Sequence, residues 1–453
     1  MTTTAALVDH LHAIRIEDLP GEVQRYATVL ITDALGAGLY GSRTEVGDIV
    51  LRSVRSAAGR TPIWGRKETL DPASSALVNG TQAHACELDD YHPGAKCHPG
   101  AVVVPAALAA ASLRRTTGAD LIRAVVAGYE AMVRTSLAAG ANATRRRGWH
   151  LTGIVGPFGA ATAAAVIEEA EPTVLRRALG IAGSHAGGLF AFSASGAMTK
   201  RLHAGRAAES GLRSVQLAQE GFTGPPDVLE AADGGFLSAV SDDADPARLV
   251  AGFAQPYVLM QTAIKPYSCC GSLHSSIDAV IQLVEEHDLS GDDIAEITAH
   301  NASVVEQQCA FPYSGDGGLL EAQMSVNYCL AVAALDRAAF LPQFAEDRID
   351  RRDVQELARR VGFEIDPVID REYPRAMPAR VTIRTRSGDV LERGVPGPTG
   401  STFAPFGPEE EADKFRSLAE GVLDTTRVEE LLAALTDLPS LDDVNELGPL
   451  LAA

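Results

Sequence analysis

The chain has 453 residues, of which 46% are apolar, and a formal net charge of -20 at pH 7. This length and composition allow a large core and two domains, so an intrinsically disordered protein is excluded. The acidic balance argues against a broad surface for nucleic acid or for an anionic membrane.

From about residue 21 to residue 253 the sequence indicates a helical domain. Ala, Leu, Ile and Val recur with a period near 3.6 residues, and Gly and Pro separate the segments. Several segments are rich enough in alanine to be buried on most sides, which favours a large bundle of helices. The expected helices cover residues 21–39, 72–88, 101–116, 118–140, 156–170 and 209–220.

After Pro256 the pattern changes to that of an α+β domain. Residues 294–300 and 379–385 alternate as strands do, and residues 386–389 form a hairpin turn signal. Helical patterns at 274–287 and 324–336 predict helices packed on an antiparallel sheet. The pattern is helical again from Pro408, so we infer that the carboxyl-terminal segment returns to the first domain, which is then discontinuous.

The amino terminus and the cysteines indicate a cytoplasmic protein. The first ten residues lack a basic stretch followed by an apolar run, so no secretory signal is expected. No apolar stretch reaches the roughly 20 residues of a membrane span. The six cysteines lack the CxxC spacing of zinc or iron–sulfur sites, so free thiols are expected.

Residues 79–99 form the first of four segments rich in titratable side chains. His, Glu, Asp, Tyr and Lys are the groups that move protons or bind carboxylates near neutral pH. If the helix continues to residue 88, His84, Glu87 and Tyr91 share one stripe of it. Two prolines then hold His98 in the extended loop that follows.

Two other interpretations of this segment stay open. His84 can be a histidine that is hydrogen-bonded inside the core. A metal site can be assembled by residue type alone, although no motif such as HExxH is present. Its ligands would be His84, Glu87, Asp90 and His92.

The second segment brings three arginines, His150 and Thr152 to the start of an alanine-rich helix. A helix start offers free N–H groups and positive potential to an anion. His150 can instead be a capping or core residue. Glycines at 153, 156 and 159 resemble a dinucleotide fingerprint, but no strand precedes them.

The third segment crowds Lys200, Arg201, His203 and Arg206 together in an acidic protein. Such a run is commonly a solvated face. Lys200 stands between small and apolar residues, so partial burial would make it a carboxylate-binding group or, with a lowered pKa, a base.

The fourth segment lies where the composition changes from helical to α+β. Lys265, Tyr267, Cys270 and His274 therefore stand at a predicted domain interface, which is a preferred place for a ligand cleft. The adjacent Cys269 and Cys270 can be redox-active or simply small buried hydrophobic residues.

Taken together, these segments resemble the MmgE/PrpD family over nearly the whole chain. The motifs that carry the resemblance are AHACELDDYH, CHPG, GWHLTGIVGPFGAA, MTKRLHAGRAAESG, GFTGP, KPYSCCGSLH and MPARVTIRTRSGD. The resemblance implies a fold that is mostly α with α+β, with an all-helical domain of residues 1–261 and 396–453 and a lid domain of residues 262–395. It also implies a homodimer and catalysis without a metal or an organic cofactor.

The resemblance also places the family's active-site positions at Glu87, Tyr91, His98, His150, Lys200 and Lys265. We expect the catalytic residues to be His98, His150, Lys200 and Lys265. The expected substrate-binding residues are Glu87, Tyr91, Thr152, Arg201, Cys270 and His274. Two positions depart from the family pattern: Glu87 is often Asp, and Cys270 stands where cis-aconitate decarboxylases carry a histidine, which argues against decarboxylation.

Members of the family include 2-methylcitrate dehydratase, cis-aconitate decarboxylase and iminodisuccinate epimerase. Dehydration and epimerisation both remove a proton beside a carboxylate, and cationic groups stabilise the enediolate-like charge that results. The predicted function is dehydration of a small hydroxy di- or tricarboxylate. The alternatives are an epimerase of a succinate-type substrate, a decarboxylase, and a binding protein without activity.

Overall fold

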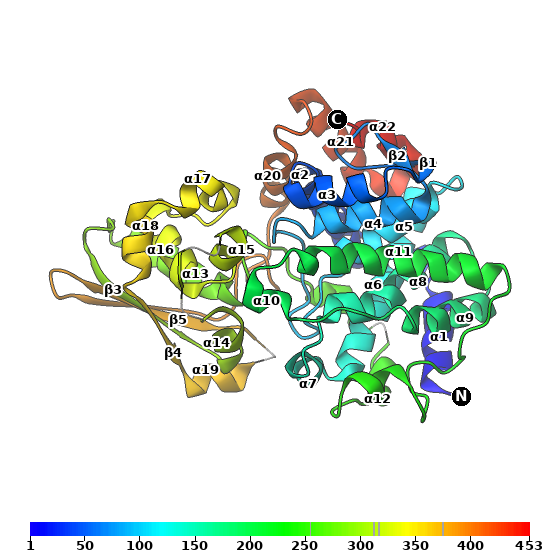
Figure 1. Ribbon diagram of the computed structural model, residues 1–453, viewed down its shortest axis with the longest axis horizontal. Helices are drawn as coiled ribbons and strands as arrows, with labels where there is room; N and C mark the ends of the chain where they lie inside the picture. Colours follow the sequence, from blue (N-terminus) through cyan, green and yellow to red (C-terminus); the bar gives the residue numbers. More distant parts are fainter. Residues whose placement is uncertain (254, 311–312, 316–317, 374–375) are drawn as a thin grey trace. The chain divides into compact units, whose positions relative to one another are not determined.

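The computed structural model describes residues 1–253, 255–310, 313–315, 318–373 and 376–453 (Figure 1). The chain forms two compact units: unit 1 comprises residues 1–193, 198–262 and 407–453, and unit 2 comprises residues 194–197 and 263–406. The predicted fold class, mostly α with a smaller α+β part, is confirmed. The predicted domain limits at 262 and 395 stay predictions.

Unit 1 is built around helix α8, which is buried along its whole length and packs against α5, α6 and α11. One small antiparallel sheet, β1 (Ala58–Pro62) with β2 (Thr69–Leu70), is added to the helices and was not predicted. The helices of unit 1 are α1 (Thr3–Ala13), α2 (Gly21–Gly41), α3 (Glu45–Ser53), α4 (Pro72–Ala83), α5 (Gly100–Ala111), α6 (Gly118–Ala139), α7 (Ala141–Arg146), α8 (Leu151–Ile167), α9 (Pro172–Gly183), α11 (Thr199–Gln219), α12 (Phe236–Val240), α20 (Pro408–Ala419), α21 (Thr425–Thr436) and α22 (Leu447–Leu451). The short α10 (Phe192–Ser195) precedes α11 in the chain.

Four helix limits differ from the prediction by five residues or more, and three of them lie where charged or polar residues are buried. Helix α4 ends at Ala83 rather than near 88, α8 begins at Leu151 rather than 156, and α11 begins at Thr199 rather than 209. The fourth is the end of α5, at Ala111 rather than 116. The prediction followed apolar spacing. The first turn of α11 instead buries Lys200 and Arg201, which an apolar pattern does not detect.

Helices α4 and α11 cross in close contact at two glycines, Gly80 and Gly205. A Cβ on Gly205 would overlap the carbonyl oxygen of Leu77 and the Oγ1 of Thr81. The crossing matters for the site, because residues 84–99 follow α4 and the buried cations begin α11.

The Gly205→Ala variant is therefore expected to be less stable by about 1–3 kcal/mol, because overpacking pushes two helices apart. Urea unfolding followed by circular dichroism measures the change. The control is Gly21→Ala at the exposed start of α2, where a Cβ meets no atom within 4 Å. Equal midpoints for both variants would contradict the close crossing.

Unit 2 is a mixed sheet covered by helices (Figure 1). Its strand order is β4–β3–β5–β6, in which β3 pairs antiparallel with β5 and β5 pairs antiparallel with β6. The predicted sheet was antiparallel, and β4 corrects this, because it was not predicted and runs parallel to β3. Helix α13 packs on β5 and β6, and α16 packs on α13 and β4. The strands are β3 (Ile294–Asn301), β4 (Val361–Ile365), β5 (Ala379–Thr385) and β6 (Val390–Val395); the helices are α13 (His274–Glu286), α14 (Ser303–Cys309), α15 (Gly318–Gln323), α16 (Val326–Asp336), α17 (Glu346–Ile349), α18 (Arg352–Ala358) and α19 (Pro367–Glu372).

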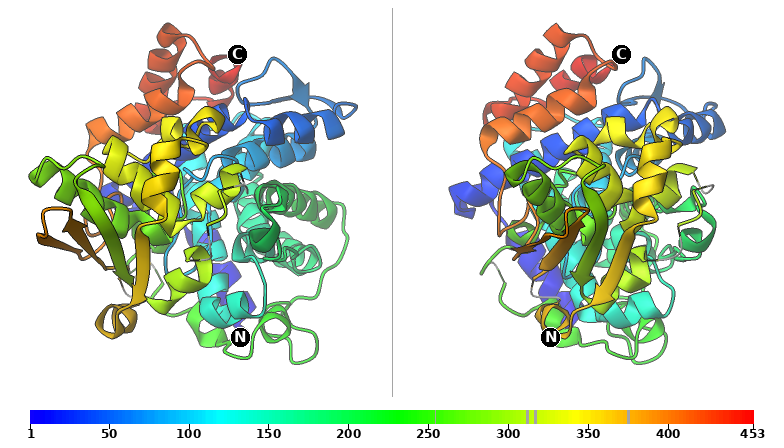
Figure 2. Two further views of the ribbon diagram at one scale, coloured as in Figure 1. Left: turned by 60° about the vertical axis from the view of Figure 1, so that its left-hand side comes forward. Right: turned by 90° about the vertical axis from the view of Figure 1, so that its left-hand side faces the viewer.

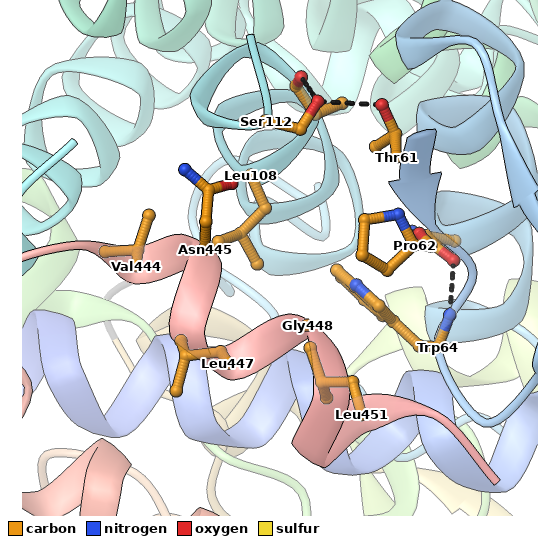
Figure 3. Close-up of a pocket in the computed structure, with 12 residues that line it drawn as sticks. Thr61, Pro62, Trp64, Leu108, Ser112, Val444, Asn445, Leu447, Gly448 and Leu451 are labelled. Atoms are coloured by element: carbon orange, nitrogen blue, oxygen red, sulfur yellow. Dashed lines mark hydrogen bonds between the residues drawn. The ribbon is translucent and has the colours of Figure 1, made fainter. Parts of the chain in front are cut away.

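The carboxyl-terminal segment packs on the amino-terminal helices of unit 1, as both views in Figure 2 show, and α20 contacts α2. Its last helix closes a cavity of about 30 Å³ together with α5 and the Pro62–Trp64 turn (Figure 3). That volume corresponds to about one water molecule, so this cavity is too small for a polycarboxylate. Among the described residues, no helix has the length and apolar character needed to cross a membrane.

Candidate active site

The loop between α4 and α5, residues 84–99, contributes several of the candidate site residues. Helix α4 begins at Pro72 behind the N-cap Asp71, whose side chain accepts from the N–H groups of Ala73 and Ser74. Past Ala83 the chain leaves the helix, and Glu87 has a φ of 58°, in the left-handed region. The expected stripe of His84, Glu87 and Tyr91 on one helix is therefore wrong, because long-range pairing of Glu87 outweighs local helix propensity.

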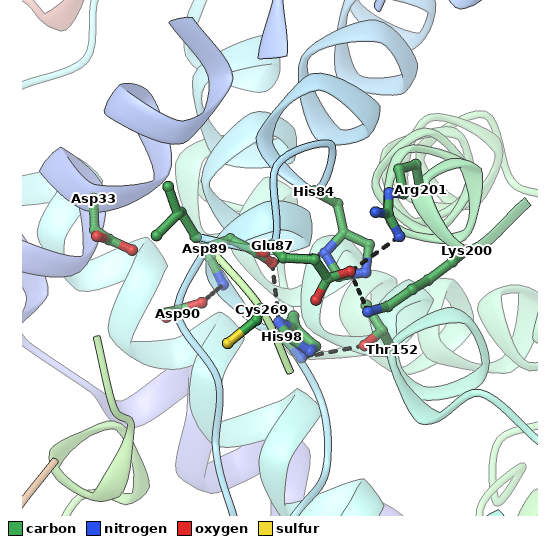
Figure 4. A network of polar contacts seen from close by, with 12 residues as sticks. Asp33, His84, Glu87, Asp89, Asp90, His98, Thr152, Lys200, Arg201 and Cys269 are labelled. Atoms are coloured by element: carbon green, nitrogen blue, oxygen red, sulfur yellow. Dashed lines mark hydrogen bonds and ion pairs between the residues drawn. The ribbon is translucent and has the colours of Figure 1, made fainter. Parts of the chain in front are cut away.

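Asp89 joins two histidines of this loop (Figure 4). Its Oδ2 accepts a hydrogen bond of 2.7 Å from His84 Nδ1, and His98 Nδ1 lies 3.1 Å from the same oxygen. Burial raises the pKa of Asp89, but the two histidines outweigh burial and hold that pKa well below its usual value. With Nδ1 directed at this carboxylate, His98 presents its Nε2 as the proton-transferring atom.

His84 is the inner member of this group. It is fully buried, and burial lowers its pKa to about 4 against the opposing effect of Asp89. His84 is therefore neutral at pH 7 and supports Asp89, as the interpretation of a hydrogen-bonded core histidine predicted. His98 is partly open, with 14% of its side chain exposed, and Tyr91 lies beside it with ring centroids 6.4 Å apart.

Glu87 forms a buried ion cluster with the first turn of α11 (Figure 4). Its Oε1 pairs with Lys200 Nζ and lies 3.0 Å from Arg201 Nη1. No more than 7% of any of the three side chains is exposed. Two buried cations therefore contact one carboxylate in this cluster. The solvated-face interpretation of this segment is wrong for Lys200 and Arg201.

His150 lies at the start of α8 and is buried. It is the N-cap residue by position, but its side chain makes no capping bond, and its backbone N–H donates to the Gly188 carbonyl at 2.9 Å. Its ring centroid lies 6.0 Å from that of His84. Burial, followed by the nearby basic groups His84, His203, Lys200 and His98, lowers the pKa of His150 well below its usual value, so this imidazole is neutral at pH 7.

Several groups hold the loop in place. Thr152 Oγ1 accepts from the His98 backbone N–H at 3.2 Å. Lys414 of α20 donates to the Leu88 carbonyl at 2.7 Å and to Asp33 Oδ1 at 2.5 Å. The Leu88 carbonyl lies between Glu87 and Asp89 in the chain, so this contact fixes the backbone that directs these two carboxylates.

The metal set proposed from residue types does not come together. Glu87 pairs with cations, Asp90 accepts from Tyr129 at 2.6 Å, and His92 Nδ1 accepts from the Ala95 N–H at 3.0 Å. Another set, His84, Asp89 and His98, offers ligand atoms within 4.8 Å of one another. There both histidines direct Nδ1 at Asp89, an arrangement that fits a hydrogen-bonded proton relay.

The other predicted site residues belong to unit 2. Lys265 and His274 are buried and Cys270 is partly buried. His274 begins α13, with its Nε2 3.4 Å from the Cys269 carbonyl oxygen. The structure thus brings Glu87, Tyr91, His98, His150, Thr152, Lys200 and Arg201 together in unit 1. The participation of Lys265, Cys270 and His274 stays a prediction.

Sequence reasoning missed three supporting residues: Asp89, His203 as a partner of His150, and Lys414. His203 could have been found, because it follows Lys200 by three residues and so shares a helix face with it. Asp89 lies within the first motif. Lys414 is 326 residues from its Leu88 partner, and no local pattern predicts such a contact.

The buried histidines His84, His92 and His150 are expected to make stability fall in acid. Burial lowers the pKa of His84 and of His92 to about 4. Unfolded histidines titrate near pH 6.5, so between pH 6.5 and 4 the unfolded chain binds more protons and the free energy of unfolding falls as pH falls. His92→Asn keeps an acceptor for the Ala95 N–H and should reduce this slope by up to about 1.4 kcal/mol per pH unit.

Urea unfolding at several pH values across this window measures the slope. The control is His287→Asn, a histidine that is exposed at the end of α13. An unchanged slope in His92→Asn would show that His92 is not held neutral in the folded protein.

Comparison with known proteins gives relatives over nearly the whole chain. Models of the MmgE/PrpD N-terminal and C-terminal domains match residues 5–249 and 267–438. A cis-aconitate decarboxylase of Aspergillus terreus is 30% identical over 458 residues, covering 96% of this chain and 93% of the relative. The cis-aconitate decarboxylase of Homo sapiens is 30% identical over 464 residues, covering 99% and 94%. That of Mus musculus is 27% identical over 467 residues, covering 99% and 93%. The resemblance seen in the motifs is confirmed, and the chain belongs to the MmgE/PrpD family.

Proposed function

We propose that the protein is a lyase that removes water from a small hydroxy di- or tricarboxylate without an organic cofactor. The observation that carries this proposal is the pair His98 and His150, whose ring centroids lie 4.7 and 6.0 Å from that of His84. His98 contacts the Asp89 carboxylate, whereas His150 is buried and neutral. Two such histidines supply the acid and the base that an elimination needs.

The chemistry follows from these groups. One histidine removes the proton from the carbon beside a substrate carboxylate, and the electron pair becomes an enediolate. Lys200 and Arg201, the two cations that contact Glu87, stabilise that intermediate. The enediolate then expels the hydroxyl group, which takes a proton from the other histidine and leaves as water, and a carbon–carbon double bond forms. Lys265 stays in the proposal as a further cation for the substrate, with Cys270 and His274 as contacts.

Decarboxylation is the second candidate, and the relatives favour it, because those described above are named cis-aconitate decarboxylases. That reaction breaks a carbon–carboxylate bond and adds one proton to carbon, so it needs a single acid and the same cations. Cys270, in place of the histidine expected of such decarboxylases, favours dehydration.

One experiment separates the candidates. The protein is incubated in deuterated water with citrate, 2-methylcitrate, cis-aconitate and iminodisuccinate, and the products are followed by NMR. New alkene signals from a hydroxy acid indicate dehydration, carbon dioxide release indicates decarboxylation, and deuterium uptake with an intact skeleton indicates epimerisation. If all four compounds stay unchanged while the protein binds a macromolecule tightly, the proposal of an enzyme is wrong.

We also propose that the protein is a cytoplasmic homodimer, as its family resemblance implies. Light scattering coupled to size-exclusion chromatography tests the assembly. A mass equal to one chain at micromolar concentration would overturn it.

A further inference from the structure

His203 of α11 contacts His150 through an unusual pair of atoms. Its Nδ1 lies 2.9 Å from His150 Nδ1, and the ring centroids are 5.1 Å apart with planes tilted by 43°. A hydrogen bond between two ring nitrogens holds one hydrogen, so one ring donates it and the other accepts it.

The direction of this bond decides what the other nitrogen of His150 can do. If neutral His150 donates from Nδ1, its Nε2 has a free lone pair and acts as a base. If it accepts at Nδ1, its Nε2 carries the hydrogen and acts as an acid. We propose that His203 is a positioning residue that sets whether His150 works as acid or base in the reaction. This inference rests on the proposed function, in which His150 exchanges a proton with substrate.

His203 directs the His150 ring through this bond, and the other aromatic rings that flank His150 here are apolar. Phe190 and Phe192 meet the His150 ring edge to face, with centroids 5.9 and 5.3 Å away, and they offer no donor or acceptor. Two glycines make room for His203. A Cβ on Gly188 would lie 3.3 Å from His203 Nδ1, and one on Gly153 would lie 3.2 Å from His203 Cβ.

Protonation of His203 would fix the direction of the bond. A doubly protonated His203 can only donate, so His150 must then present Nε2–H. His203 is half-buried whereas only 4% of His150 is exposed, so His203 is the member that meets solvent. Burial lowers the pKa of His203, which favours its neutral form.

The described groups that act most strongly on His150, besides His203, are basic side chains. His84 and His98 of the 84–99 loop and Lys200 of α11 act on His150. Lys200 and Arg206 lie one turn from His203 on its own helix, and the Arg145 guanidinium lies over the Phe190 ring. None of these groups is a carboxylate, so the single shared hydrogen of the pair is set by the two histidines.

The test compares His203→Phe, which removes the partner atom, with His203→Asn, which keeps a neutral polar group that cannot titrate. His185→Asn is the control, because His185 is exposed beyond the end of α9. The pH profile of kcat and the ¹⁵N NMR shifts of the histidine rings are measured for each. The His150 signals are assigned by their loss in His150→Asn.

We expect His203→Phe to lower kcat by at least about 10-fold with KM within about 3-fold, since a wrong tautomer of a catalytic histidine lowers kcat by on the order of 10⁴ in serine proteases. In substrate-free protein, the His150 ring shifts should change with the titration of His203, and this dependence should vanish in both His203 variants. His203→Asn should recover part of kcat, and His185→Asn should match the wild type.

Wild-type kcat and an unchanged pH profile in both His203 variants would overturn the inference, as would His150 shifts that do not respond to them. If His203→Phe fails to fold by circular dichroism, His203→Asn decides. If the wild type turns over none of the four polycarboxylates, the proposed function fails, while the NMR shifts still decide whether His203 sets the tautomer of His150.

Discussion

Replacement of His98 by asparagine is expected to lower kcat by about 10²–10⁴-fold, the range that a positioned acid or base contributes. The amide of the introduced asparagine can neither donate nor accept a proton in the reaction, although it retains a polar group beside Asp89. Binding should change little, because the cations of α11 stay in place. Steady-state kinetics on the substrate identified by NMR, together with calorimetric binding of the same compound, separates these two effects.

Asp89→Asn is the paired variant. It retains the size and one acceptor oxygen of Asp89 but loses the carboxylate charge beside His98. We expect it to lower kcat less than His98→Asn does, because the His98 ring stays and loses only the charged group that orients it. His287→Asn is the control. A His98→Asn enzyme with near wild-type kcat would remove His98 from the proposed catalytic pair.

The sequence predicted the type of fold well because its signals are local and repeated. Alanine-rich helical periods and the 379–385 strand with its hairpin turn are such signals, and the structure contains both the helices and the β5–β6 hairpin. The sequence did not predict β4, whose residues Val361–Ile365 pass from buried to exposed along the strand without a clear alternation. A short strand of this kind is fixed by its parallel partner β3, and that contact is not local.

The sequence named residues of the candidate site but did not predict how they are arranged in space. His98, His150 and Lys200 were identified from their motifs, and the structure brings them together in unit 1. The pairing of Glu87 with both cations of α11 could not be derived, because it depends on the left-handed backbone at Glu87 and on the crossing of α4 with α11. Local propensity favoured continuing the helix, whereas the buried charges require the loop.

The buried cluster of Glu87, Lys200 and Arg201 leads to the second large effect. Glu87→Gln removes the carboxylate that both buried cations contact, which is expected to destabilise the folded protein by about 3–5 kcal/mol. Lys200→Met keeps the contact of Glu87 with Arg201, so it should lose less stability while still lowering kcat. The midpoint of urea unfolding measures both variants.

A polycarboxylate should partly reverse the damage in Glu87→Gln, because a ligand that binds only the folded state raises stability by mass action. The thermal shift produced by the substrate should therefore be larger in Glu87→Gln than in the wild type. The matched control is Glu209→Gln on α11, the helix that carries Lys200 and Arg201. The ion pair of Glu209 with Arg206 is partly exposed, so its loss should change stability by less than about 1 kcal/mol. If Glu87→Gln proved as stable as Glu209→Gln, Glu87 would not be neutralising the cations of α11, and the role assigned to this cluster would be wrong.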